Sequence, residues 1–283
     1  MHSFDRGLVL GSGGPVGTAW MAGLAHGLRR EGVDLGEADL VVGTSAGAIV
    51  AALLATGQDL GRLATTSARP AGHRPVADPE RMGAVFAVLG DHGLEPGDAR
   101  RRVGRIALDS ADHKAEEALI AGRGALIGAH AWPDRRLLIT AVDAANGEPV
   151  VWGRDSGVPL VHAVAASSAF PGVEPPVTIN GRQYMDGALR SGTNADLAVG
   201  ASTLVVVEPM AHLLPRASLD QELAVVGAHT VMTVGPDPAS VRAFGPDLND
   251  RAAWEPAYQA GLRQADDLGR RLRPGWRLRL APQ

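Results

Sequence analysis

The chain has 283 residues, of which 45 % are hydrophobic and 20 % charged. That much apolar material can build a sizeable core, so we expect a globular protein. The formal net charge of −4 provides no basic surplus, which argues against a nucleic-acid partner. The absence of cysteine excludes disulfides, thiolate metal sites and a cysteine nucleophile, and it is typical of a reducing compartment.

The sequence shows neither a signal-peptide pattern nor a transmembrane segment. Residues 1–6 lead straight into an apolar run, without the layout of a secretory signal. The longest apolar stretch, residues 46–55, is interrupted by Gly47 and is shorter than the roughly 20 residues that span a bilayer. We therefore expect a soluble, cytoplasmic protein that can still contact a membrane surface peripherally. The sequence does not define the oligomeric state.

The first sixty residues predict alternating strands and helices. A short apolar run at 8–10 ends in glycines and is typical of a buried parallel strand, and apolar residues at helical spacing follow over 18–30. A second apolar run at 40–42 and an apolar helix over 46–56 repeat the pattern. This order indicates an α/β fold with a parallel sheet.

The middle of the chain, residues 58–130, is polar and rich in arginine, and strand signals return only after it. In this middle part we expect helical segments that cover one side of the core, at 79–89, 97–108 and 114–121. Further on we expect strands at 136–142, 149–152, 177–179, 183–185 and 203–207, and helices at 160–166 and about 250–272. Because no internal repeat or low-complexity linker is present, we predict one domain over 1–283, with a core at about 7–210 and a helical extension at about 215–283.

Residues 43–47, Gly-Thr-Ser-Ala-Gly, match the Gly-x-Ser-x-Gly pattern of a nucleophile elbow. The segment follows an apolar strand and precedes an apolar helix, which is the context that the pattern requires. In such a turn a strained backbone lifts the serine Oγ out of the sheet, and the flanking glycines leave room for it. Ser45 is therefore our candidate nucleophile. The alternative is an ordinary turn of small residues.

A second glycine-rich turn, residues 11–17, joins the first strand to its helix. It is a poor dinucleotide-binding loop, because the third glycine of Gly-x-Gly-x-x-Gly falls one residue late. We interpret it instead as an oxyanion hole, in which the N–H groups of Gly13, Gly14 and Ala46 stabilise the charge of an acyl-transfer transition state. A turn without a function is the alternative.

A serine nucleophile needs a base, and the sequence offers two kinds. The chain order of α/β-hydrolase triads would place the histidine after Asp186, which leaves His212 and His229; an elbow after only the second strand argues against that arrangement. Asp186 itself can accept the serine proton if burial raises its pKa. The Asp-Gly pair at 186–187 is also a common hairpin turn.

Together these segments resemble the patatin-like phospholipase family. The resemblance covers roughly residues 7–210 and rests on the glycine loop, the elbow and further segments in family order at 166–172, 175–177, 184–188 and 193–196. It implies a three-layer α/β/α sandwich with a mainly parallel central sheet. It also implies hydrolysis of carboxylic esters, often of phospholipids or other lipids, through a Ser45–Asp186 dyad that uses no histidine, metal or organic cofactor.

The glycine loop departs from the family pattern Gly-Gly-Gly-x-Arg-Gly. Ser12 replaces the first glycine and Val16 replaces the arginine. Because Gly13 and Gly14 are present, we expect the oxyanion donors to be intact and an acyl-enzyme to form on the serine. Two alternatives remain open: transfer of the acyl group to an alcohol or amine, and a non-catalytic lipid- or acyl-binding protein with the same fold.

Overall fold

The computed structural model describes residues 4–65, 77–273 and 276. The expected elements of the first half form, several with ends displaced by a few residues. β1 (Phe4–Leu10), α1 (Gly14–Arg30), β2 (Leu40–Gly43) and α2 (Ala46–Ala55) alternate along the chain. The polar middle part then forms α3 (Pro79–Leu89), α4 (Pro96–Leu108) and α5 (His113–Ile127).

The second half contains the expected strands and, near the C-terminus, one that was not expected. In chain order the elements are β3 (Arg136–Asp143), β4 (Pro149–Trp152), α6 (Leu160–Ser167), β5 (Val177–Ile179), β6 (Arg182–Asp186), β7 (Ala201–Val207), α7 (Arg216–Val226), β8 (Thr230–Val234), α8 (Pro238–Phe244) and α9 (Trp254–Leu272). The expected helical extension from about 215 contains α7, α8 and α9, and it also contains the strand β8, which was not expected and pairs in parallel with β7 at the edge of the sheet. The sequence of β8, a run rich in β-branched residues between two glycines, is typical of a strand.

The eight strands of the described residues form one mixed sheet in the order β5-β6-β3-β2-β1-β7-β8, with β4 paired to β3. β3, β2, β1, β7 and β8 are parallel to one another, whereas β4 and β6 are antiparallel to β3. Leu10 pairs with Gly43, so the glycine loop after β1 and the elbow after β2 leave the same edge of the sheet. This edge, at the carboxyl ends of parallel strands, is where open α/β sheets place their sites.

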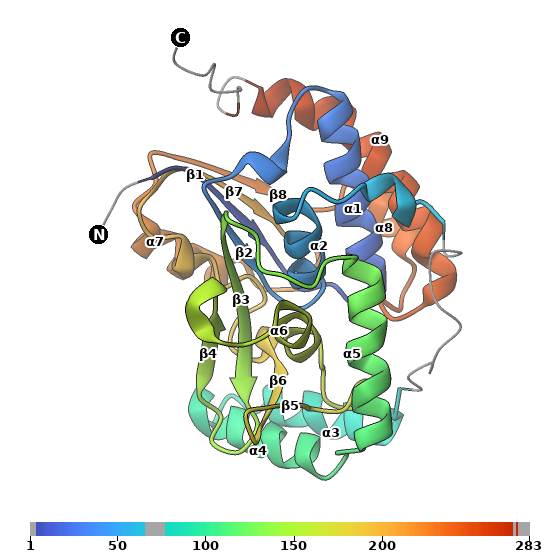
Figure 1. Cartoon of the computed structure of the whole chain (residues 1–283), viewed down its shortest axis with the longest axis vertical. Helices are drawn as coiled ribbons and strands as arrows, with labels where there is room; N and C mark the ends of the chain where they lie inside the picture. The colour runs from blue at the N-terminus through green and yellow to red at the C-terminus, as the bar shows by residue number, and fades with distance from the viewer. Residues whose placement is uncertain (1–3, 66–76, 274–275, 277–283) are drawn as a thin grey trace.

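Helices cover both faces of the sheet (Figure 1). On one face, apolar side chains of the central strands pack in a single cluster with α1, α2, α5, α6 and α9. On the other face, strand residues such as Val9 and Val206 pack against Leu219 and Val226 of α7. The fold is thus the three-layer α/β/α sandwich with a mainly parallel sheet that the family resemblance implied. None of the described helices combines the length and apolarity needed to cross a membrane.

The C-terminal helix α9 lies against α1 at very short range. A Cβ on Gly23 of α1 would overlap the carbonyl oxygen of Tyr258, and a Cβ on Gly261 of α9 would overlap that of Trp20. Glycine at both positions lets the two backbones approach. The segment that precedes α9 is held close to the glycine loop, because the N–H of Val16 donates to the carbonyl oxygen of Leu248 at 3.2 Å.

Candidate functional site

Ser45 lies in the turn between β2 and α2, with φ 56° and ψ −118°. A positive φ is strained for a residue with a side chain, and the surrounding contacts hold it in place. The flanking glycines are needed, because a Cβ on Gly47 would overlap the carbonyl oxygen of Leu10 and one on Gly43 would lie 2.7 Å from Ala48 Cα. The turn therefore has the geometry of a nucleophile elbow.

Asp186, at the end of β6, faces Ser45 directly. Ser45 Oγ donates a hydrogen bond to Asp186 Oδ2 at 2.7 Å, and the N–H of Ala188 donates to Oδ1 at 2.8 Å. Asp186 is 1 % exposed. Burial raises the pKa of this carboxyl to about 7, against the opposing effects of the two hydrogen bonds and of the positive charge of Arg123. A carboxyl that titrates near neutrality is suited both to accept and to return a proton.

A buried polar network joins the two turns that carry this pair. Asn194 Nδ2 and Thr140 Oγ1 each donate to Thr44 Oγ1 at 3.0 Å, and Asn194 is fully buried. A Cβ on Gly187 would overlap the Thr140 hydroxyl, so only glycine lets the second turn approach so closely. Because Thr44 and Gly187 adjoin the serine and the aspartate, the network fixes their relative position.

Replacing Asn194 with alanine is expected to lower kcat for a dissolved ester about tenfold and the free energy of unfolding by about 2 kcal/mol, because it leaves buried groups without partners. Steady-state kinetics and urea unfolding would measure the two effects. Asn146→Ala, at an exposed turn, serves as the control. A destabilised Asn194→Ala protein with an unchanged kcat would contradict the positioning role.

The glycine loop packs beside the elbow, and its members have different surroundings. Gly14 has φ 60°, and a Cβ there would lie 2.8 Å from the carbonyl oxygen of Leu248. Gly14 and Ala46 both line the pocket that contains Ser45. Within the described part of the chain, neither N–H group donates to a protein acceptor. Gly13 is not among the lining residues, and a Cβ there would lie 2.6 Å from Pro209 Cβ.

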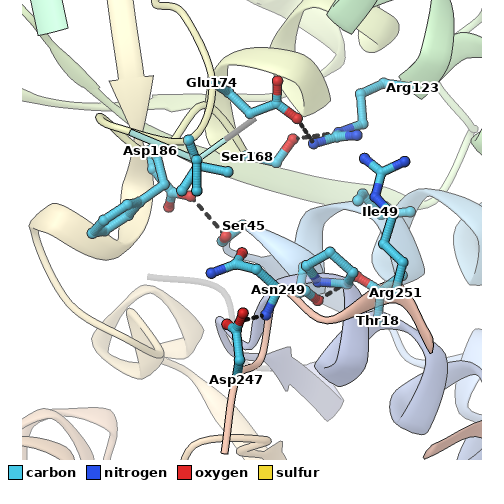
Figure 2. A pocket seen from close by; sticks show the side chains of 16 residues that line it. Thr18, Ser45, Ile49, Arg123, Ser168, Glu174, Asp186, Asp247, Asn249 and Arg251 are labelled. Carbon is cyan, nitrogen blue, oxygen red and sulfur yellow. Dashed lines mark hydrogen bonds and ion pairs between the residues drawn. The ribbon is translucent and has the colours of Figure 1, made fainter. Parts of the chain in front are cut away.

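A cavity of about 230 Å³ opens over the Ser45–Asp186 pair. Its apolar wall comes from Pro15, Ile49, Phe170 and Val173. Figure 2 shows Arg123, Ser168 and Glu174 on one side of the pair and Asp247 and Asn249 on the other, and Arg251 also lines the cavity. The cavity thus combines an apolar surface with charged groups, as a site for an amphipathic molecule would.

Most of these polar lining residues were not found from the sequence. Arg123 of α5 donates through Nε to Ser168 Oγ at 2.8 Å and through Nη2 to Glu174 Oε1 at 3.2 Å. The polar residues of 247–251 reach the cavity from the segment before α9. Arg123 and the residues of 247–251 belong to no motif, and only the packing of distant elements brings them to the serine. Val16, in place of the arginine of the family pattern, is fully buried in the core.

Neither candidate histidine lies at the cavity. The His212 ring packs against Phe244 with ring centroids 6.1 Å apart. The backbone N–H of His229 donates to the carbonyl oxygen of Ser202 at 3.0 Å. No histidine is among the described residues that line the pocket. In this part of the chain the structure therefore brings together a serine and a carboxyl, without the imidazole of a triad.

The chain is similar to a known family and to several solved structures. A family model described as patatin-like phospholipase matches residues 8–199. Among solved structures, the chain is similar to VipD from Legionella pneumophila, with 13 % identity, a TM-score of 0.43, and 93 % of this chain and 67 % of that chain covered. It is also similar to the type III effector ExoU, with 17 % identity, a TM-score of 0.35, and coverage of 94 % and 53 %.

A structure of full-length SpcU in complex with full-length ExoU from the type III secretion system of Pseudomonas aeruginosa is similar to the chain at 18 % identity, with a TM-score of 0.35 and coverage of 93 % and 53 %. The chain therefore spans about two thirds of the VipD chain and about half of the ExoU chains. No curated protein matches the sequence.

Proposed function

Because this chain belongs to the patatin-like phospholipase family, we propose that it is a lipid acyl-hydrolase that cleaves carboxylic esters with Ser45 as nucleophile and Asp186 as base. The family supports lipid acyl hydrolysis in general. The observation that carries the finer assignment is the 2.7 Å hydrogen bond from Ser45 Oγ to Asp186 Oδ2, inside a cavity and at a strained turn.

The first half-reaction would acylate the serine. Asp186 accepts the proton of Ser45 Oγ while Oγ attacks the ester carbonyl carbon. The N–H groups of Gly14 and Ala46, with Gly13 as the third proposed donor, stabilise the oxyanion of the tetrahedral intermediate. As the intermediate collapses, the bond between the carbonyl carbon and the leaving oxygen breaks, and Asp186 gives its proton to the departing alkoxide.

The second half-reaction would release the acid. Asp186, again ionised, accepts a proton from water as the water oxygen attacks the acyl carbon. Collapse of the second tetrahedral intermediate breaks the bond to Ser45 Oγ, which takes the proton back from Asp186. The carboxyl returns to its starting state, so the cycle balances without any further reactant.

The make-up of the cavity supports a lipid ester as substrate. The apolar wall with Ile49 and Phe170 suits an acyl chain, and the charged groups at Arg123 and Arg251 suit a polar head group. If an added alcohol such as glycerol acts as acceptor, the product is a new ester instead of the free acid. Product analysis with and without glycerol therefore separates hydrolysis from acyl transfer.

The test is covalent labelling with a fluorophosphonate, followed by intact-mass measurement. We expect a single phosphonyl adduct on the wild-type protein, none on Ser45→Ala, and labelling slowed about 100-fold in Asp186→Asn, because the base that activates the serine is gone. Ser110→Ala is a control serine in the turn between α4 and α5. An adduct that persists in Ser45→Ala would overturn the assignment. His212→Ala and His229→Ala are expected to label at the wild-type rate.

A further inference from the structure

Helix α3 exposes an apolar surface. Residues 82–90, Met-Gly-Ala-Val-Phe-Ala-Val-Leu-Gly, contain no charged side chain. Val85 is nevertheless the one fully buried residue of α3, while Phe86 is 54 % and Leu89 39 % exposed. A surface helix normally presents polar residues to water. Folding alone therefore does not account for the outer face of α3, which we call the α3 face: Gly83, Ala84, Phe86, Ala87 and Leu89.

The α3 face is continuous with the wall of the candidate active site. The N–H of Asp78, just before the helix, donates to the carbonyl oxygen of Gly172 at 2.8 Å. The Phe86 ring lies against the Phe170 ring with centroids 5.9 Å apart, and Phe170 lines the cavity over Ser45. Figure 1 shows α3 beside α4 at one end of the molecule. One apolar surface therefore extends from solvent to the cavity.

We propose that the α3 face docks on a zwitterionic lipid surface, so that an ester can pass from that surface into the cavity. The proposal rests on the proposed function, because the substrate of a lipid acyl-hydrolase resides in an aggregate. Continuity with the cavity favours lipid over a protein partner. The small size of the face also favours a lipid surface. The face consists of five residues of one helix, whereas a stable protein interface uses about 20–30 residues a side.

The charges around α3 indicate which lipid surface fits. Between residues 78 and 112 the sequence has seven acidic residues and five arginines. This balance provides no attraction for anionic lipids, and docking would depend on insertion of apolar side chains at the interface. Binding to phosphatidylcholine vesicles should therefore persist at high salt, which screens electrostatic attraction.

The experiment is flotation of the 283-residue chain with phosphatidylcholine vesicles at low and high salt. Ser45→Ala is the background for all samples, so that hydrolysis does not alter the lipid. Leu89→Glu, and separately Ala87→Glu, should lower the bound fraction about tenfold at both salt concentrations, because a charge at the interface resists insertion. Val225→Glu is the matched control, since Val225 is 60 % exposed on α7, away from the cavity, and should bind as well as the parent.

Three results would overturn the proposal: no vesicle binding by the parent protein, equal binding by the α3 variants, or a dimer in size-exclusion chromatography that Leu89→Glu converts to monomer. Flotation does not depend on turnover, so the two proposals can fail separately. A protein that floats through α3 but turns over no ester supports docking and overturns the hydrolase. In an active protein with Ser45 intact, Leu89→Glu should lower turnover of vesicle esters relative to a dissolved ester about tenfold.

Discussion

Asp186→Asn is expected to lower kcat/KM for an ester about 1,000-fold while the protein remains folded. Asparagine has the same shape and keeps an oxygen for the N–H of Ala188, but it cannot take the proton of Ser45. Steady-state kinetics with an active-site titration would measure the loss. Asp143→Asn is the control, because Asp143 is a buried carboxylate that pairs with Arg182 instead of the serine. A comparable loss in both variants would contradict the assignment of the base.

The raised pKa of Asp186 gives this prediction a pH dependence. Only the ionised carboxyl accepts a proton, so wild-type kcat/KM should rise with pH through about 7. Stability should change in the opposite direction. The folded state holds a proton that the unfolded chain, with a pKa of 3.8, releases, so the free energy of unfolding falls as pH rises from 3.8 to about 7.

The Asp186→Asn protein has no carboxyl at this position, so its free energy of unfolding should not fall with pH in this way. Above pH 7 it should be more stable than the wild type by up to about 4 kcal/mol. Thermal unfolding of both proteins at about pH 5 and pH 8 would measure the difference. If the difference in the free energy of unfolding between wild type and variant is the same at both pH values, burial does not raise the pKa of Asp186. The proton cycle proposed for Asp186 then loses its basis.

Gly47→Ala is the second change for which we expect a large effect: loss of ester turnover and a decrease of more than about 3 kcal/mol in the free energy of unfolding. The added methyl group would overlap the carbonyl oxygen of Leu10, a backbone atom at the end of β1 that cannot rotate away. Either the elbow or the end of the central strand must move. Urea unfolding and fluorophosphonate labelling would measure the two consequences.

Gly122→Ala is the matched control for this change. Gly122 lies within α5, and a Cβ there would meet no heavy atom within 4 Å. Alanine lowers the conformational freedom of the unfolded chain and favours the helix, so stability should rise by about 0.5–1 kcal/mol. If Gly47→Ala were as well tolerated, the close approach of the elbow to β1 would not be what requires glycine at position 47.

The sequence predicted most of the elements that follow local rules. Apolar runs bounded by glycine identified β1 and β2, and helical spacing identified α1 and α9, because a buried strand and an amphipathic helix each impose a period on their own residues. The elbow at Ser45 was found for the same reason, since its glycines are a local steric requirement. Asp186 emerged only from its place among several segments in family order, because an Asp-Gly pair by itself is also a common turn.

The rest depends on contacts that no local pattern encodes. Arg123 meets Ser168 and Glu174 because α5 packs beside α6, and nothing in the sequence around Arg123 distinguishes it from the other arginines of the middle part. β8 was not predicted, because its short β-branched run lies in a region that was expected to be helical. The different surroundings of Gly13 and Gly14 follow from Pro209, which only the folded chain brings to the loop.

The hydrogen bond from the backbone N–H of Val16 to the carbonyl oxygen of Leu248 holds the segment before α9 against the glycine loop. The family match ends at residue 199, whereas 247–251 form part of the cavity wall. Part of the cavity wall thus comes from a stretch of the chain that is separate from the one with Ser45 and Asp186, and α8 and α9 hold this stretch at its two ends. Exchanging residues 247–251 between proteins of this architecture is therefore expected to change selectivity while Ser45 and Asp186 stay unchanged.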